Sequence, residues 1–315
     1  MYASLARICH MYYNEGLTQQ QIANRLHMSR IKVSRLLQQA RTNGVVRIEI
    51  KYDNYYPDLE NALQQEYGIQ FIVADSVSDQ PGDLRDSLGA TAAEYLGRIL
   101  GERDVVTVGW GTTMASVAEH LSSDTQSATF VPIVGGQANV GLDVHANSVA
   151  ARMAANTGGR SEALFAPAVA ESAEARQMLA ESRPVARILN MAANAPICVF
   201  SLGAPFSPTS TITMIGYYTP TDIDMLRSEG AACDIISIAY YDPAGERCGV
   251  AVSSRTVSIT EPQLRAIPHK VCVAGGPDKH EAIRIALDLG CYIDVMILDD
   301  RTARYLLGQQ LPASP

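Results

Sequence analysis

The chain has 315 residues, of which 47% are hydrophobic and 18% charged, and its formal net charge is -8. This composition supports a sizeable buried core and excludes global disorder, and the length suggests two domains or one large α/β domain. Neither a run of about 18 apolar residues nor the apolar stretch of a secretory signal is present, so we expect a cytoplasmic protein without a membrane partner.

Charge is divided unevenly along the chain. Residues 1–52 carry eight Lys and Arg against two acidic residues, whereas residues 53–315 carry 17 against 31. A small basic segment joined to a large acidic one is typical of a DNA-binding module attached to a second domain. Charge alone also fits a solvated face on an ordinary domain, so the pattern within the basic segment decides between the two.

Apolar spacing in the basic segment predicts three short helices, the first over 5–13. Thr18 is placed to cap the second helix, over 19–26. Ser29 is placed to cap the third, over 30–43. Two short helices joined by a tight turn, with a basic outward face on the second, form a helix-turn-helix. We therefore expect residues 30–43 to be a DNA recognition helix.

The exposed start of the third helix is where we expect DNA contacts. Ser29 would serve both as helix cap and as phosphate contact, and Ile31 is placed to touch a thymine methyl group. Solvated side chains are the alternative, but basic residues clustered at one helix start favour contact with phosphates or with a groove. The expected DNA-binding residues are Thr18, Gln19, Ser29, Arg30, Ile31, Lys32, Ser34 and Arg35. The near-alternating residues 45–52 then predict a short strand that fits a wing.

The next segment, residues 53–68, predicts an amphipathic helix with Leu59, Leu63 and Tyr67 on one face. Such a helix fits a connector or a dimer contact. From residue 69 onward strands and helices alternate, which predicts an α/β fold with a doubly wound, mostly parallel sheet.

The predicted elements give three domain segments. They are a helix-turn-helix domain over 1–52, a connector helix over 53–68 and a Rossmann-like, effector-binding domain over 69–315. Within the last segment we expect, among other elements, one long helix over 171–194, one strand over 234–241 and a further strand from Cys248.

Polar, glycine-rich loops follow three of the predicted strands. Ligands of such sheets bind at the carboxyl ends of the strands. Backbone N–H groups at the start of the following helix can cradle an anion, and a bound anion would explain a lysine in a first helical turn. The residues expected at this effector site are Gly109, Gly111, Thr112 and Thr113 in the first loop, Gly135, Gly136, Gln137 and Asn147 in and after the second, Asp234, and Gly275, Gly276 and Lys279 in the third.

Each of these features has a plainer interpretation. A single loop could be an ordinary tight turn with Lys279 solvated, but three converging loops favour a site. Asp234 is either a cap-like loop residue or an acceptor for a ligand hydroxyl. Trp110, the only tryptophan, either stacks on a ligand or packs in the core. No loop matches a nucleotide-binding glycine motif and no two of the six cysteines have C-x-x-C spacing, so we expect no nucleotide, metal or other cofactor.

Taken in order, these residues resemble the SorC family of sugar-binding transcriptional regulators. The resemblance covers essentially the whole chain and rests on LTQQQIANRLHMSRIKVSRLL, VGWGTT, VPIVGGQ, HANSVAARMA, AACDII and VAGGPDKHEAIRIAL. It implies an N-terminal helix-turn-helix and an effector domain like those of sugar-phosphate isomerases and coenzyme A transferases. It also implies dimers or tetramers, and control of an operon by a sugar or its phosphate.

The resemblance implies roles for individual residues as well. The family's phosphate-binding glycine turn falls on Gly109 to Thr113, its phosphate-holding lysine on Lys279 and its hydroxyl-binding aspartate on Asp234. Two positions depart from the family pattern, and both concern the shape of the ligand. Ser201 stands in a strand end that is usually glycine-rich, and Cys233 stands where a glycine usually precedes the aspartate.

We therefore expect a DNA-binding regulator of a carbohydrate-utilisation operon that is controlled by a sugar or sugar phosphate and has no catalytic residue. We expect it to bind an operator of palindromic or paired half-sites as a homodimer or homotetramer. The alternative is a sugar-phosphate isomerase-like enzyme that carries a DNA-binding head. Such an enzyme needs a positioned acid or base, and the candidates Asp234, Asp143 and His145 form no recognisable pair. A DNA architectural protein without a ligand would leave the three polar loops unexplained.

Overall fold

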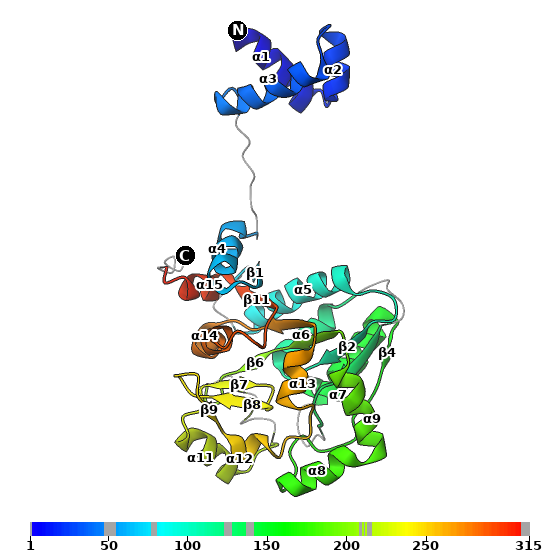
Figure 1. Cartoon of the computed structure of the whole chain (residues 1–315), viewed down its shortest axis with the longest axis vertical. Coiled ribbons are helices and arrows are strands. Elements are labelled where there is room, and N and C mark those ends of the chain that lie inside the picture. Colours follow the sequence, from blue (N-terminus) through cyan, green and yellow to red (C-terminus); the bar gives the residue numbers. More distant parts are fainter. Residues whose placement is uncertain are drawn as a thin grey trace. The chain divides into compact units, whose positions relative to one another are not determined.

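The computed structural model describes residues 2–46, 55–76, 81–122, 128–136, 142–207, 210, 212 and 216–309. The chain divides into two compact units, Met1–Asp53 and Asn54–Pro315, whose elements are labelled in Figure 1. Each unit has a hydrophobic core of its own. Among the described helices, none is both long and apolar enough to cross a lipid bilayer.

The first unit is a small helical bundle. Its elements are α1 (Tyr2–Cys9), the π-helical turn η1 (His10–Asn14), α2 (Gln19–Arg25) and α3 (Arg30–Thr42). Thr18 caps α2 by accepting a hydrogen bond from the backbone N–H of Gln21, and Ser29 caps α3 by accepting one from that of Lys32. Both caps predicted from the sequence are therefore confirmed. Of the wing expected over 45–52, all but the first two residues lie outside the described residues.

A seven-stranded, wholly parallel sheet forms the centre of the second unit, in the order β1-β11-β10-β5-β2-β3-β4. The chain leaves β2 for β3 and β4 and only then returns to β5 on the other side of β2. In open parallel sheets, ligands bind beside such a reversal of strand order. The strands are β1 (Gln70–Ala74), β2 (Val105–Val108), β3 (Thr129–Pro132), β4 (Arg160–Ser161), β5 (Ile197–Phe200), β10 (His269–Val273) and β11 (Val295–Asp299).

Helices cover both faces of this sheet, as Figure 1 shows. Consecutive strand residues point to opposite cores: Val271 and Val273 belong to one, and Cys272 belongs to the other. The core with the two valines also contains α5 (Pro81–Ile99), α6 (Thr112–His120) and α7 (Ala146–Thr157). The core with the cysteine contains α4 (Pro57–Tyr67), α9 (Arg183–Ala193), α13 (Glu261–Ala266) and α14 (His280–Asp288). The predicted α/β fold with a doubly wound sheet is confirmed.

A second, four-stranded antiparallel sheet lies beside the first. Its strands, in order, are β6 (Leu202–Gly203), β7 (Cys233–Ile235), β8 (Ala239–Tyr241) and β9 (Arg247–Cys248). The remaining elements are α8 (Ala173–Glu181), α11 (Pro220–Ser228), α12 (Val250–Ser253), α15 (Asp300–Leu306) and the short 3-10 turns η2 (Leu142–Val144) and η3 (Pro277–Lys279).

The structure corrects three predicted elements. The long helix over 171–194 is two helices, because Pro184 lacks the N–H that an uninterrupted helix would need and instead stands at the start of α9. The strand over 234–241 is the hairpin β7–β8, which turns at Ile236 and Ser237 with φ of 52° and 60°. The strand expected from Cys248 ends there, since left-handed Gly249 starts α12.

The amphipathic helix expected over 53–68 is α4, but its apolar face is already covered. Leu63 is fully buried and Leu59 nearly so, in the core that also contains Phe71 of β1. The prediction that this face fits a dimer contact is therefore wrong, because a single chain buries it.

Candidate functional site

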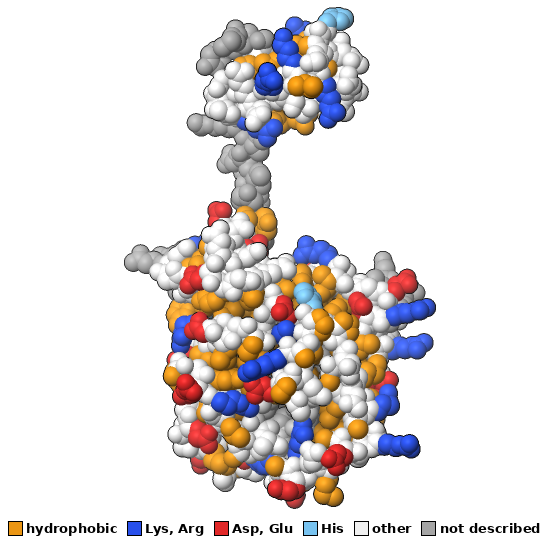
Figure 2. All heavy atoms as spheres, in the orientation of Figure 1, with side chains coloured by type: hydrophobic (Ala, Val, Ile, Leu, Met, Phe, Trp, Pro, Cys, Tyr) orange, Lys and Arg blue, Asp and Glu red, His pale blue; other side chains and the backbone are white. Residues whose placement is uncertain are grey.

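The outer face of α3 presents polar, basic and apolar side chains to solvent. Val33 and Leu37 are buried on its inner face, whereas Ile31 is 74% exposed. Figure 2 shows Lys and Arg side chains on the face of this unit that is in view. Of the residues predicted to contact DNA, Gln19 is half-buried and the exposed ones are Thr18, Ser29, Arg30, Ile31, Lys32, Ser34 and Arg35. The structure thus leaves three basic side chains, Arg30, Lys32 and Arg35, exposed in the first turns of the expected recognition helix.

In the second unit a cavity of about 360 Å³ opens at the carboxyl ends of β1, β2, β5, β10 and β11. This is where the strand order reverses. Its lining brings together part of the first and third glycine loops with the predicted aspartate. The predicted residues that line it are Gly111, Thr112, Thr113, Asp234, Gly275, Gly276 and Lys279.

Glycine geometry shapes two walls of this cavity. Gly111 and Gly276 have φ of 113° and 92°, which favour glycine, and each precedes a helical turn. No side chain caps α6, so the backbone N–H groups of its first turn are available to a ligand beside Thr112 and Thr113. A Cβ atom on Gly275 would lie 2.3 Å from Oδ2 of Asp299, so a larger residue cannot be accommodated there without movement.

The buried carboxylate of Asp299 holds the third loop in place. It accepts hydrogen bonds from the backbone N–H of Gly276 at 2.8 Å and from the hydroxyl of Thr302 at 2.6 Å. Lys279, in the same loop, donates from its ammonium group to the hydroxyl of Ser201 at 3.2 Å. The loop is therefore fixed from two sides while its lysine faces the cavity.

Burial shifts the pKa values of two oppositely charged residues in the cavity lining. Burial raises the pKa of Asp234 from 3.8 to about 7, against a hydrogen bond from the backbone N–H of Ser237 and the charge of Lys279. Burial lowers the pKa of Lys279 from 10.5 to about 8, and Asp234 opposes that change. Both groups can therefore change charge near neutral pH, and a bound anion would favour the ammonium form of the lysine.

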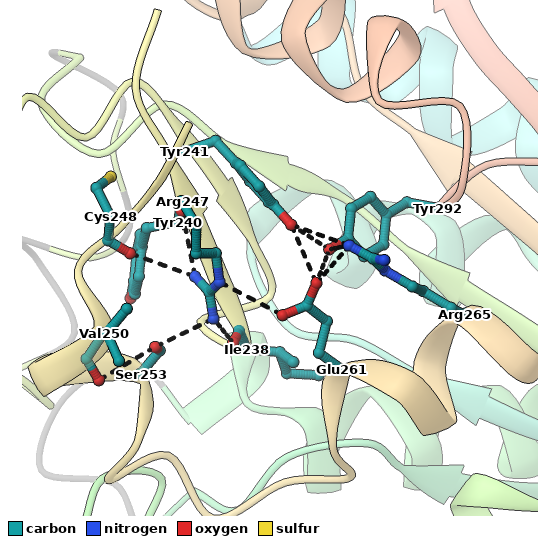
Figure 3. A network of polar contacts seen from close by, with 10 residues as sticks. All are labelled: Ile238, Tyr240, Tyr241, Arg247, Cys248, Val250, Ser253, Glu261, Arg265 and Tyr292. Atoms are coloured by element: carbon teal, nitrogen blue, oxygen red, sulfur yellow. Dashed lines mark hydrogen bonds and ion pairs between the residues drawn. The ribbon is translucent and has the colours of Figure 1, made fainter. Parts of the chain in front are cut away.

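The hairpin that carries Asp234 is anchored by a network of charged and aromatic side chains, drawn in Figure 3. Arg247 donates to the backbone oxygens of Ile238 and Tyr240 at 3.0 and 3.2 Å and pairs with Glu261 at 3.4 Å. Glu261 also accepts hydrogen bonds from Tyr241 at 3.0 Å and from Arg265 at 2.6 Å. Since Glu261 begins α13, the network ties the small sheet to that helix.

Several residues predicted from the second loop do not line the cavity. Gly135 has no room for a Cβ, which would lie 2.4 Å from the backbone oxygen of Pro167. Beside Gly136 stands the hydroxyl of Tyr217, and Asn147 exchanges two hydrogen bonds with the backbone of Leu164. These three residues make contacts within the second unit and are not among the cavity's lining residues, so their effector role stays a prediction; Gln137 lies outside the described residues.

Gly109 and two of the three proposed acid and base residues, Asp143 and His145, are also not among the residues that line the cavity. A Cβ on Gly109 would lie 3.1 Å from Cβ of Phe200, so this glycine allows close packing against β5. Asp143 is paired with Arg152 at 2.9 Å and His145 with the hydroxyl of Tyr217. Of the three candidates for proton transfer, only Asp234 lines the cavity.

Sequence reasoning missed part of the lining. Trp110 lines the cavity and also packs against the hydrophobic core, so both of its interpretations fit; its ring centroid lies 5.7 Å from that of Tyr217. Several missed polar residues follow strands or lie on helices without glycine motifs, so no local pattern marks them. They are Ser76, Arg85, Asp299 and Arg301.

Both units of the chain are similar to known proteins. Residues 55–308 match a family model described as "Putative sugar-binding domain", and residues 6–43 match the model of region 4 of sigma-70. The deoxyribonucleoside regulator of Bacillus subtilis is 30% identical over 304 residues, which are 95% of each chain. The sorbitol operon regulator of Klebsiella pneumoniae is 29% identical over 96% of this chain and 97% of its own. The crystal structure of that full-length regulator, SorC, superposes with a TM-score of 0.72 and covers 97% of this chain and 99% of its own.

Proposed function

This chain belongs to the SorC family of sugar-binding transcriptional regulators, and we propose that a sugar or sugar phosphate held by Gly111, Asp234 and Lys279 controls its binding to operator DNA. The observation that carries the proposal is the cavity itself. It joins an uncapped helix start, a lysine and a buried aspartate at the strand reversal of the sheet. The first two favour an anionic group, and the aspartate is an acceptor for hydroxyl groups.

The relatives are named as regulators of operons, which supports a regulator and not the enzyme alternative. The geometry of the cavity agrees with this, because two of the three candidate acids and bases have partners outside it. We propose that Thr112, Thr113, Gly275 and Gly276 complete the effector site through backbone and hydroxyl contacts.

The first unit supplies the DNA contacts in this proposal. A helix-turn-helix covers one half-site, so specific binding needs two copies on paired half-sites. We therefore propose a homodimer or homotetramer in the cytoplasm, where the operon lies. The exposed residues at the start of α3, with Arg35 and Lys32 foremost, would contact phosphates and base edges.

A thermal-shift screen of sugars and their phosphates tests the proposal. A ligand present at about 100 times its Kd adds about 2.7 kcal/mol to the stability of the protein that binds it. We expect a sugar or sugar phosphate to raise the melting temperature of the wild type and not to be consumed. Product formation would instead support the isomerase-like enzyme, and a shift that persists unchanged in Lys279→Ala would place the ligand elsewhere.

A further inference from the structure

Two residues at the end of β1 connect the cavity to the beginning of the second unit. Ser76 lines the cavity, and its backbone N–H donates to Oδ1 of Asp300 at 3.1 Å. The hydroxyl of Ser76 donates to the same carboxylate oxygen. The neighbouring residue, Asp75, accepts a hydrogen bond of 2.5 Å from the hydroxyl of Tyr56. The peptide bond between Asp75 and Ser76 thus joins two hydrogen bonds, one beside the cavity and one to Tyr56.

Tyr56 lies close in sequence to the boundary between the two units. It is the residue that precedes α4, and it stands three positions after Asp53, the last residue of the first unit. Burial and the hydrogen bond to Asp75 raise the pKa of its hydroxyl, which therefore stays protonated and donates at neutral pH. Tyr56 thus joins the start of α4 to the end of β1 by a hydrogen bond.

The start of α15 connects the end of β1 to the loop that carries Gly276 and Lys279. Asp299 holds the N–H of Gly276, while the next residue, Asp300, holds Ser76. The loop that carries Lys279 and the end of β1 therefore share adjacent carboxylates. Figure 1 shows α4, β1, β11 and α15 grouped together, and β1 pairs with β11 while α15 packs against α4.

We propose that the hydrogen bonds of Ser76 to Asp300 and of Tyr56 to Asp75, joined by the peptide bond between Asp75 and Ser76, transmit the state of the cavity to the point where the DNA-binding unit is attached. The inference rests on the proposed function, in which the cavity holds the effector. Tyr56 acts as a positioning residue that contacts neither effector nor DNA. A change in the position of Ser76 when the cavity is filled alters the acceptor available to Tyr56, and with it the start of α4.

A role limited to holding α4 on the sheet predicts something different. The buried Leu59 and Leu63 already fix α4, so loss of one hydroxyl would then change stability alone. Transmission predicts that a change at the cavity alters operator affinity only while Tyr56 keeps its hydroxyl. Operator affinity, and not stability, is the quantity that separates the two roles.

A double-mutant cycle on the full-length protein tests the proposal. Ser76→Ala removes the hydroxyl at the cavity, and Tyr56→Phe removes the hydroxyl at the attachment point. Operator affinity is measured by fluorescence anisotropy on a DNA fragment that the wild type has selected from a random library. We expect Ser76→Ala to change the operator Kd by about 3- to 30-fold with Tyr56 present and by less than about 2-fold in Tyr56→Phe.

Tyr67→Phe is the matched control. Tyr67 lies on the same helix, with its ring centroid 5.9 Å from that of Phe71. Ser76→Ala should keep its full effect in this background. The same effect of Ser76→Ala in the Tyr56→Phe and wild-type backgrounds, or no effect of Ser76→Ala on operator Kd at all, would overturn the proposal.

Different results would contradict the proposed function. If the wild type selects no DNA, both the regulator function and the transmission from Ser76 to Tyr56 are contradicted. Inorganic phosphate, compared with sodium chloride at equal ionic strength, probes the cavity independently of the cycle. Stabilisation of the wild type but not of Lys279→Ala by phosphate supports the anion site whatever the cycle shows, and equal stabilisation of both argues against that site.

Discussion

Lys279 and Ser201 are joined across the floor of the cavity, where the lysine ammonium group donates a hydrogen bond of 3.2 Å to the serine hydroxyl. The two residues follow neighbouring parallel strands, β10 and β5. A neutral hydroxyl is a weaker acceptor for an ammonium group than a phosphate oxygen. We therefore expect an anionic ligand to replace Ser201, which departs from the family pattern, as the partner of Lys279.

Loss of the lysine should weaken effector binding. A charge-assisted hydrogen bond contributes about 1.5–3 kcal/mol, so Lys279→Ala should raise the Kd of a phosphorylated effector by about 10- to 100-fold. Isothermal titration calorimetry with the sugar phosphate that most stabilises the wild type measures this. Arg98→Ala, which removes an exposed charge paired with Glu94, is the control and should leave the Kd unchanged. An unchanged Kd in Lys279→Ala would show that the lysine is not a ligand contact.

Effector affinity should depend on pH in a bell-shaped manner. Asp234 accepts a ligand hydroxyl best as a carboxylate, so affinity should rise as the pH increases through its pKa of about 7. Lys279 loses its charge as the pH increases through about 8, so affinity should then fall. Titrations across this range should find the tightest binding between these values. Asp234→Asn should abolish the acid limb and keep the alkaline one, and a flat profile in the wild type would contradict these charge roles.

The sequence predicted the lining residues in the glycine loops of the cavity better than those at the ends of β1 and β11. The positions of Gly111 and Gly276 follow from strand-to-helix turns, which a local pattern reveals. Asp299 and Ser76 reach the same place only because β11 and β1 are neighbours, and no local pattern encodes that pairing. The hairpin at Ile236 was missed for another reason: a β-branched residue with a φ of 52° gives no sequence signal for a turn.

The exposed start of α3 should determine operator affinity. Arg35→Ala and Lys32→Ala each remove an exposed cation, so operator binding should weaken while the fold and the effector Kd stay unchanged. Loss of a phosphate contact should also reduce the slope of the logarithm of the binding constant against the logarithm of salt concentration by about 1. Anisotropy at several salt concentrations measures both. Glu119→Ala, far along the chain in α6, serves as a charge control, and wild-type affinity in both head variants would refute the DNA-contact assignment.

The chain should assemble at least into a dimer. Since the apolar face of α4 is buried within one chain, the prediction now rests on the need for two helix-turn-helix units on paired half-sites. Analytical ultracentrifugation at micromolar concentration, with and without operator DNA, should give at least twice the mass of one chain. A monomer under both conditions would contradict the paired-site arrangement.

The central claim, that occupancy of this cavity controls operator binding, is tested most directly by titrating a preformed operator complex with the stabilising sugar or sugar phosphate. The account predicts that operator affinity of the wild type changes by about 5- to 150-fold at saturation, the usual range of coupling between two sites. Lys279→Ala should reach the same change only at about 10- to 100-fold higher concentration. An operator affinity that does not respond to a compound bound in this cavity would contradict the account.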